Sequence, residues 1–159
     1  MQKKLIELEE LAEKVRALRK AGKTIVFTNG CFDLLHVGHV RYLEAAKTEG
    51  DILVVGVNSD QSVQLIKGPR RPVVPENERS EVLASLGCVD YVTIFDDPDP
   101  LAVIKLLRPD VLVKGADWPE DGIVGKQVVE ENGGRVVRVP LAEGASSTRL
   151  IERVLAGYH

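Results

Sequence analysis

The first residues of the chain repeat apolar side chains at the spacing of an α-helix, with charged residues between them. This pattern is typical of an amphipathic helix that packs one face on a core. The Ala21-Gly22 pair favours a stop, and we therefore predict a helix over residues 4–20. Its apolar face consists of Leu5, Leu8, Leu11, Val15 and Leu18.

Apolar runs of strand length fill the rest of the chain, separated by segments with helical spacing. Several runs are almost continuously apolar, as expected for strands buried on both faces. The alternation predicts an α/β fold, in which a parallel sheet carries helices on both faces. The predicted strands span residues 24–28, 52–57, 91–95, 111–113 and 136–139. The predicted helices span residues 38–49, 76–86, 99–107, 124–132 and 147–156.

Unusual residues concentrate in the segments that follow the predicted strands. In an open parallel sheet, ligands bind outside the carboxyl ends of the strands. The longest irregular stretch, KGPRRPVVP at residues 67–75, combines three prolines with three basic residues, and we interpret it as a mobile charged loop. The ligand site is therefore expected in the loops at residues 28–37, 58–75, 96–98, 114–123 and 140–147.

Composition limits the class of protein. A chain of 159 residues, 44% hydrophobic and 28% charged, suits one globular domain. The net charge of −3 gives no basic field for a nucleic-acid partner. No apolar run approaches the roughly 20 residues that cross a membrane, and the charged N-terminus is unlike a signal peptide. Cys31 and Cys88 lack CxxC spacing, so we expect reduced thiols in a cytoplasmic protein without a membrane partner.

The stretch TNGCFDLLHVGH, which follows the first predicted strand, places two histidines around a glycine. Its Asn29-Gly30 pair can form a tight turn whose N–H groups face a ligand. The first turn of the next helix favours an anion, because its N–H groups are unpaired. His36 and His39 are therefore candidate donors to phosphate oxygens. Alternatively, both histidines cap or pack the turn.

Zinc is a third possibility for the two histidines. A zinc site needs at least three protein ligands, and neither Asp33 nor His159 is a convincing third one. Asp33 can equally brace the turn. We therefore predict no metal ligand among the side chains.

The run GCFDLLHVGH, at residues 30–39, is similar to the nucleotidyltransferase superfamily with the HxGH motif. A second family motif, a Ser/Thr-rich turn that opens the last helix, reads EGASSTR at residues 143–149. Both motifs stand in the family's order at predicted helix N-termini, and the resemblance covers about residues 24–156, the expected catalytic core. It implies a Rossmann-like, doubly wound, five-stranded parallel sheet. A single nucleotidyltransferase domain over residues 1–159, with an N-terminal helix at 1–22, is expected.

Three shorter stretches resemble one branch of this superfamily, the D-glycero-β-D-manno-heptose 1-phosphate adenylyltransferases: residues 28–33, 113–118 and 139–144. The resemblance implies transfer of AMP from ATP, with Mg²⁺, to a sugar 1-phosphate, giving ADP-heptose and pyrophosphate for lipopolysaccharide core synthesis. A sugar kinase would act upstream, and the family's tendency to pair suggests a homodimer.

Two alternatives remain at this level. The glycerol-3-phosphate cytidylyltransferase branch usually carries RTEG where this chain reads LAEG at residues 141–144. Cytidylyl transfer to glycerol phosphate or another alcohol phosphate is therefore disfavoured but stays open. A nucleotide-binding module without turnover is the second alternative.

The resemblance implies catalytic roles for His36, His39 and Lys67. The acceptor phosphate is already ionised, so these side chains would stabilise charge rather than act as bases. The expected nucleotide-binding residues are Asn29, Gly30, Cys31, Phe32, Gly38, Lys114, Gly115, Asp117, Ser146, Ser147 and Thr148. The expected acceptor-binding residues are Asp33, Arg70, Arg71, Arg79 and Trp118.

Several of these roles compete with structural ones. Arg79 can form an ion pair with Glu76 or Glu78. Lys114 can pair with Asp117. The Ser/Thr run can cap the last helix, the tryptophan can serve as apolar cover, and the loop arginines can be solvated.

Overall fold

The computed structural model describes residues 3–158, and its centre is a parallel sheet in the order β3-β2-β1-β4-β5. All five predicted strands are confirmed, with boundaries that differ by no more than two residues from those expected. The strands are β1 (Ile25–Gly30), β2 (Ile52–Asn58), β3 (Tyr91–Phe95), β4 (Val111–Gly115) and β5 (Arg135–Val139).

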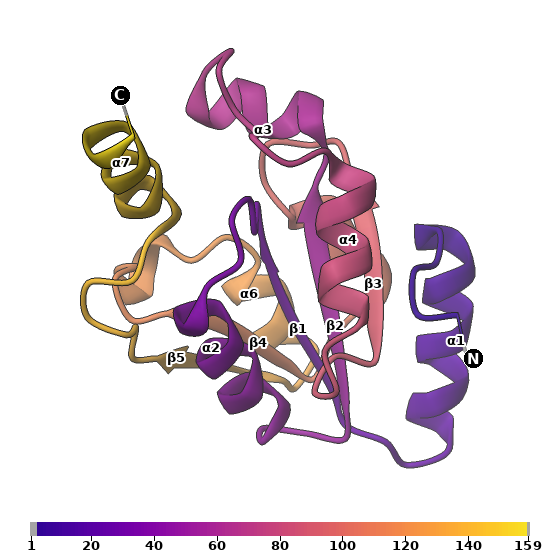
Figure 1. Ribbon diagram of the computed structural model, residues 1–159. Helices are drawn as coiled ribbons and strands as arrows, with labels where there is room; N and C mark the ends of the chain where they lie inside the picture. Colours follow the sequence, from indigo (N-terminus) through magenta and orange to yellow (C-terminus); the bar gives the residue numbers. More distant parts are fainter. Residues whose placement is uncertain (1–2, 159) are drawn as a thin grey trace.

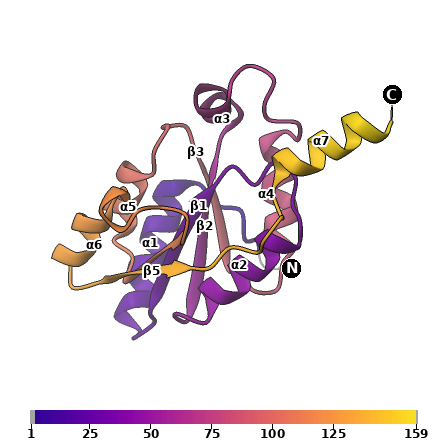
Figure 2. The ribbon, with the colours of Figure 1, turned by 90° about the vertical axis from the view of Figure 1, so that its left-hand side faces the viewer.

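Helices cover both faces of the sheet, which confirms the doubly wound α/β fold (Figures 1 and 2). On one face pack α1 (Leu8–Lys20), α5 (Leu101–Leu107) and α6 (Lys126–Glu131). On the other face pack α2 (Val37–Lys47) and α4 (Glu76–Ala84). The remaining helices are α3 (Asp60–Lys67), the 3-10 turn η1 (Glu120–Gly122) and α7 (Ser147–Gly157).

The central strands are buried on both faces because their side chains alternate between two apolar clusters. Phe27 and Val54 belong to the cluster under α1 and α5, whereas Val26 and Val55 belong to the cluster under α2 and α4. All four side chains are fully buried. This alternation explains why the runs are continuously apolar in the sequence.

The first helix begins at Leu8, so the prediction of helix from residue 4 was wrong at its start. Leu5 forms a parallel bridge with Val92 on β3. The Val92 N–H donates to the Lys4 carbonyl at 2.9 Å, and the Ile6 N–H donates to the Val92 carbonyl at 3.0 Å. The apolar spacing of the sequence continues through this segment, but pairing with a sheet edge takes the backbone groups that a helix would need.

The prediction of an irregular loop directly after β2 was also wrong. This segment contains α3. Ser59 caps this helix by accepting the Ser62 N–H at 3.1 Å. Only Ser62 and Val63 are buried in α3, and Leu65 is 67% exposed. The helix has only eight residues, which is too short for the apolar repeat that marks a helix in the sequence.

The chain leaves β1 toward β2 and β3, then returns to the other side of β1 to form β4 and β5. A switch point in strand order therefore lies between β1 and β4. In doubly wound sheets the loops diverge there and leave a crevice at the carboxyl ends of the strands. The structure thus directs attention to the loops after β1, β2 and β4.

Candidate active site

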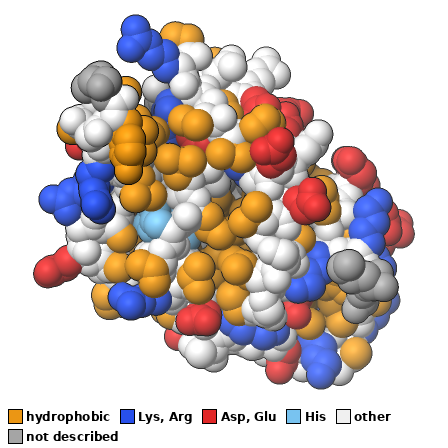
Figure 3. Space-filling model, in the orientation of Figure 1, with side chains coloured by type: hydrophobic (Ala, Val, Ile, Leu, Met, Phe, Trp, Pro, Cys, Tyr) orange, Lys and Arg blue, Asp and Glu red, His pale blue; other side chains and the backbone are white. Residues whose placement is uncertain are grey.

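A cavity of about 520 Å³ opens at the carboxyl edge of the sheet, as expected. Segments that follow each of the five strands contribute to its wall. Figure 3 shows histidine atoms (pale blue) at the surface of this face, bordered largely by apolar side chains. The predicted residues that line it are Asn29, Gly30, Cys31, Phe32, Asp33, His36, Gly38, His39, Lys67, Lys114, Gly115, Asp117, Trp118, Ser146, Ser147 and Thr148.

The two histidines form the start of α2 as a stacked pair. Their ring centroids lie 3.9 Å apart at an interplanar angle of 27°. His36 is the N-cap, and its Nδ1 accepts the Gly38 N–H at 3.1 Å. His39 Nδ1 accepts the His36 N–H at 3.3 Å. The capping alternative is therefore correct for the Nδ1 atoms, and it leaves both Nε2 atoms for a ligand.

Both imidazoles are neutral at physiological pH in this environment. Burial lowers the pKa of His36 below its ordinary value. For His39, burial first, and then the neighbouring His36 and Lys67 side chains, lower the pKa to about 4. A neutral imidazole whose Nδ1 accepts a hydrogen bond carries its proton on Nε2. The pair therefore presents two N–H donors to the cavity.

Gly38 allows this pair to approach the loop before α7. A Cβ at Gly38 would lie 2.8 Å from His36 Cε1 and 2.9 Å from the Ala145 Cβ. Any side chain there would push the histidine cap away from the Ser/Thr-rich turn. The glycine of the HxGH motif thus brings two helix N-termini together.

The Ser/Thr-rich turn meets the first loop directly. Ser146 caps α7 by accepting the Arg149 N–H at 3.0 Å. Ser147 Oγ donates to the Leu34 carbonyl at 3.1 Å and lies 3.4 Å from the Leu34 N–H. Thr148 lines the cavity. The capping role expected for this run is confirmed for Ser146, while Thr148 faces the same space as the histidines.

Lys114 is a buried cation at the end of β4. It is 8% exposed, and its Nζ donates to Asn29 Oδ1 at 2.5 Å. Burial lowers its pKa to about 8, against an opposing effect of Asp117. Its hydrogen-bond partner is Asn29 and not Asp117, which was considered above as an alternative partner. Trp118 is 47% exposed, with its ring centroid 5.6 Å from Lys114 Nζ.

The structure gives Asp33 the role of a brace. Its carboxylate is fully buried and accepts from Arg71 Nε at 2.6 Å and from the Val73 and Val74 N–H groups at 2.9 to 3.0 Å. Burial alone would raise the pKa of Asp33, but these hydrogen bonds lower it below its ordinary value. Its acceptor capacity is directed to the loop that follows α3, not to the cavity.

The three arginines expected near the acceptor do not line this cavity. Arg71 is held by Asp33, and Arg70 is exposed. Arg79 is 2% exposed and bonds to Asp60, so neither Glu76 nor Glu78 is its ion-pair partner.

The sequence did not point to several other residues of the cavity wall. Tyr42 lies one turn after the histidines, and its hydroxyl contacts Thr28 Oγ1 at 2.7 Å and the Val113 carbonyl at 3.1 Å. Burial raises its pKa to about 12. Tyr42 follows His39 by three residues on the same helix, and this spacing could have indicated that both side chains lie on one face. The other unexpected wall residues are Asn58, Ile66, Pro98, Asp99, Pro100, Val124, Leu141, Ala142 and Ala145.

Within residues 3–158, no group of three or more His, Cys, Asp or Glu side chains is arranged to hold a metal ion. His159, considered above as a zinc ligand, lies outside the described residues. None of the helices in the described part of the chain is long and apolar enough to cross a membrane.

The chain resembles known proteins over nearly its whole length. It is 53% identical over 150 residues to the bifunctional protein HldE of Syntrophotalea carbinolica, covering 94% of this chain and 31% of that protein. It is 54% identical over 155 residues to the HldE protein of Geobacter metallireducens, covering 98% and 32%. The chain thus spans about a third of the length of these relatives.

A solved structure shares the fold. The lipopolysaccharide core biosynthesis protein of Thermoplasma volcanium is 30% identical, with a TM-score of 0.63, and the match covers 78% of this chain and all of that one. A sequence profile described as cytidylyltransferase-like matches residues 27–153, which include both motifs and the whole cavity. The chain therefore belongs to the cytidylyltransferase-like family of nucleotidyltransferases.

Proposed function

We propose that the chain transfers AMP from ATP to a sugar 1-phosphate, D-glycero-β-D-manno-heptose 1-phosphate, and releases pyrophosphate. The observation that carries the proposal is the convergence of the α2 and α7 N-termini, two imidazole Nε2–H donors and Lys67 on one cavity. The HldE relatives and the lipopolysaccharide core neighbour support the choice of sugar.

The reaction requires one anion to attack another. An acceptor phosphate oxygen attacks the α-phosphorus of ATP in line, the bond to the β-phosphate oxygen breaks, and pyrophosphate leaves with the electron pair. The attacking oxygen is already ionised, so no base is needed. Catalysis then rests on fixed donors and charges that stabilise the phosphoryl oxygens.

The geometry suits this task on the α2 side of the cavity. Because each Nδ1 accepts from a backbone N–H, the rings cannot rotate to present a lone pair to a phosphate. His36 and His39 would each donate Nε2–H to phosphate oxygens. Lys67 would add a mobile positive charge from the end of α3.

The α7 side would hold the β- and γ-phosphates. The first turn of a helix offers unpaired N–H groups and a partial positive charge. Thr148 adds a hydroxyl at this site. ATP would arrive as its magnesium complex, with the ion held by triphosphate oxygens and water, since Mg²⁺ commonly keeps much of its water shell in nucleotide sites.

The β4 side would hold the nucleoside. Lys114 has three donors and gives one to Asn29, which leaves two for acceptor atoms of the nucleotide. Asp117 and Trp118 lie in the same loop and line the cavity. Their contacts would be to ribose hydroxyls and the base face.

The test is pyrophosphate release with purified chain, assayed with ATP or CTP against heptose 1-phosphate, glycerol 3-phosphate and inorganic phosphate. Release only with ATP and the heptose 1-phosphate is expected. Release only with CTP and glycerol 3-phosphate would move the chain to the neighbouring branch. ATP binding without release from any pair would identify a nucleotide-binding module. A cytoplasmic location, a kinase step upstream and a homodimer remain part of the proposal, and light scattering of the purified chain tests the last.

A further inference from the structure

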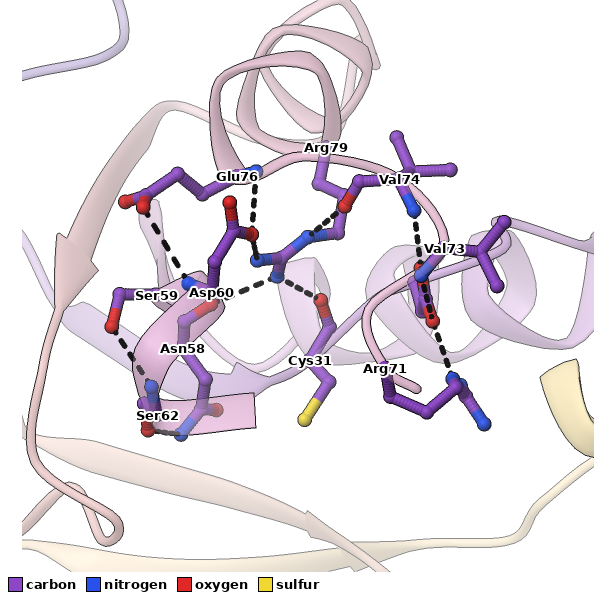
Figure 4. A network of polar contacts seen from close by, with 11 residues as sticks. Cys31, Asn58, Ser59, Asp60, Ser62, Arg71, Val73, Val74, Glu76 and Arg79 are labelled. Carbon is purple, nitrogen blue, oxygen red and sulfur yellow. Dashed lines mark hydrogen bonds and ion pairs between the residues drawn. The ribbon is translucent and has the colours of Figure 1, made fainter. Parts of the chain in front are cut away.

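Arg79 is the largest fully buried side chain, and the proposed transfer gives it no task. Its Nε donates to the Val74 carbonyl at 2.8 Å. Its two terminal nitrogens donate to the Cys31 carbonyl at 2.6 Å, the Asn58 carbonyl at 2.8 Å and Asp60 Oδ1 at 2.8 Å (Figure 4). The partners come from the loop after β1, the end of β2, the start of α3 and the segment before α4. One guanidinium thus joins four separate segments.

A buried charge is an expensive way to fill space. An apolar side chain of similar volume would avoid the desolvation cost. A flexible apolar chain, however, has no fixed directions, whereas the planar guanidinium has five donors at fixed angles. The arrangement therefore fixes the relative placement of the segments that it touches.

The first of these segments holds a backbone donor at the wall of the cavity. In a trans peptide the C=O and the next N–H point in opposite directions. The Cys31 carbonyl points at Arg79, so the Phe32 N–H points away from Arg79. Phe32 lines the cavity with a φ of 48°, and none of the hydrogen bonds within residues 3–158 uses its N–H. Arg79 thereby sets the direction of an amide in a loop that lines the cavity.

The second segment carries Lys67. Asp60 opens α3, and Lys67 is its last residue. Because α3 buries little apolar surface, polar contacts at its first turn hold it to the body. Asp60 Oδ1 accepts both from Arg79 and from the Glu76 N–H at 2.9 Å. The charge of Lys67 reaches His39, whose pKa is lowered by burial, His36 and Lys67 in that order.

We propose that Arg79 is a positioning residue for nucleotidyl transfer. Through the Cys31 carbonyl it orients the Phe32 N–H, and through the Asp60 carboxylate it holds the helix that carries Lys67. The Phe32 N–H then has a fixed direction, and the mobile Lys67 side chain starts from a fixed point beside the transferring phosphate. The inference rests on the proposed function for its catalytic consequence, but its structural half is independent of turnover.

The experiment uses three variants and one control. Arg79→Lys keeps the charge with a different donor geometry, and Arg79→Met keeps the volume without donors. Asp60→Asn weakens the contacts of α3 with Arg79 and with the Glu76 N–H, and it leaves the Arg79 contact with the Cys31 carbonyl in place. Leu107→Ala is the matched control, because it removes a fully buried side chain from α5 on the opposite face of the sheet. Melting temperature, kcat, KM for MgATP and amide hydrogen exchange are measured for each.

The expected result is a loss in kcat with KM nearly unchanged. Misplacement by about 1 Å costs on the order of 100-fold in rate, and we expect about 100-fold for Arg79→Met, about 10-fold for Arg79→Lys and a few-fold for Asp60→Asn. Hydrogen exchange should accelerate in α3 and at Phe32 in the Arg79 variants. Leu107→Ala should keep kcat within about twofold at temperatures well below its melting point, with α3 exchange unchanged.

A second measurement separates positioning from general destabilisation. Asp60→Asn combined with Lys67→Ala should lose less than the product of the two single losses, since both act on one donor. If the Arg79 variants do not fold, the inference is tested by this double-mutant cycle and by the hydrogen exchange of Asp60→Asn. Unchanged kcat and unchanged α3 exchange in a folded Arg79→Met or in Asp60→Asn would overturn the inference. A wild-type chain without pyrophosphate release would instead sink the proposed function, while faster α3 exchange in the variants would still support the structural half.

Discussion

Two helix N-termini face the same cavity, but they are held very differently. α2 starts with a double histidine cap and buries Leu43 and Ala46 in the core. α7 starts with Ser146 and buries none of its described residues, and it projects from the body of the molecule (Figures 1 and 2). We infer that the α2 donors are preorganised, whereas those of α7 are ordered by the ligand. Losses on α2 should therefore appear in kcat and losses on α7 in KM.

The largest expected effect is on the α2 side. His39→Ala should lower kcat by about 100- to 1000-fold, as removal of one oxyanion-type donor does, while the dissociation constant of MgATP changes by only a few-fold. Stopped-flow binding and steady-state pyrophosphate release measure the two quantities. Weaker ATP binding with normal turnover at saturation would contradict the contrast between the helices.

Lys67 should give the next largest effect. It is exposed at the end of α3, and its charge is useful only when the α-phosphate or the acceptor approaches. Lys67→Ala should lower kcat about 10- to 100-fold, and Lys67→Arg should recover part of it. Exposed Arg70, which does not line the cavity, gives a control in Arg70→Ala, expected to stay within about threefold. Equal losses of kcat for Lys67→Ala and Arg70→Ala would mean that the summed positive charge of the loop matters, and not Lys67 in particular.

Acidification should act on α2 and spare α7, whose hydroxyls do not titrate. The pKa of His39 is about 4 in the folded chain, against an ordinary value of 6.5. Below pH 6.5 the unfolded chain binds a proton that the folded chain does not accept until about pH 4. The free energy of unfolding should therefore fall as the pH drops through this window. Urea unfolding at several pH values should show a shallower dependence for His39→Gln, and identical profiles would remove His39 from the explanation.

The smallest effect is expected on the α7 side. Ser146→Ala removes a cap worth about 1 kcal/mol, so the KM for MgATP should rise a few-fold at nearly constant kcat. Ser85→Ala is the matched control, because this hydroxyl donates only to the Val82 carbonyl at the end of α4. A fall in kcat without a change in KM would mean that α7 is as rigid as α2.

The sheet could be predicted because its strands are buried on both faces and alternate with amphipathic helices. The HxGH and Ser/Thr-rich motifs located both helix N-termini for the same reason: each stands at a strand-to-helix junction. The elements that were predicted wrongly depend on distant contacts or are too short to show a pattern. Residues 4–6 leave helical geometry because Val92 pairs with them, and the eight residues of α3 are too few for a sustained apolar repeat. No local pattern could show that Arg79 reaches four segments or that Asn29 binds Lys114.

The bridge from Leu5 to Val92 also covers part of one edge of the sheet. On the β3 side, residues 4–6 occupy backbone groups that an added strand would need. On the β5 side, Arg135 and Arg138 are exposed, so a second chain laid along that margin would have to cover two guanidinium groups. Edge-to-edge association of sheets is thereby discouraged at both margins, which favours helices or loops as the contact between two copies.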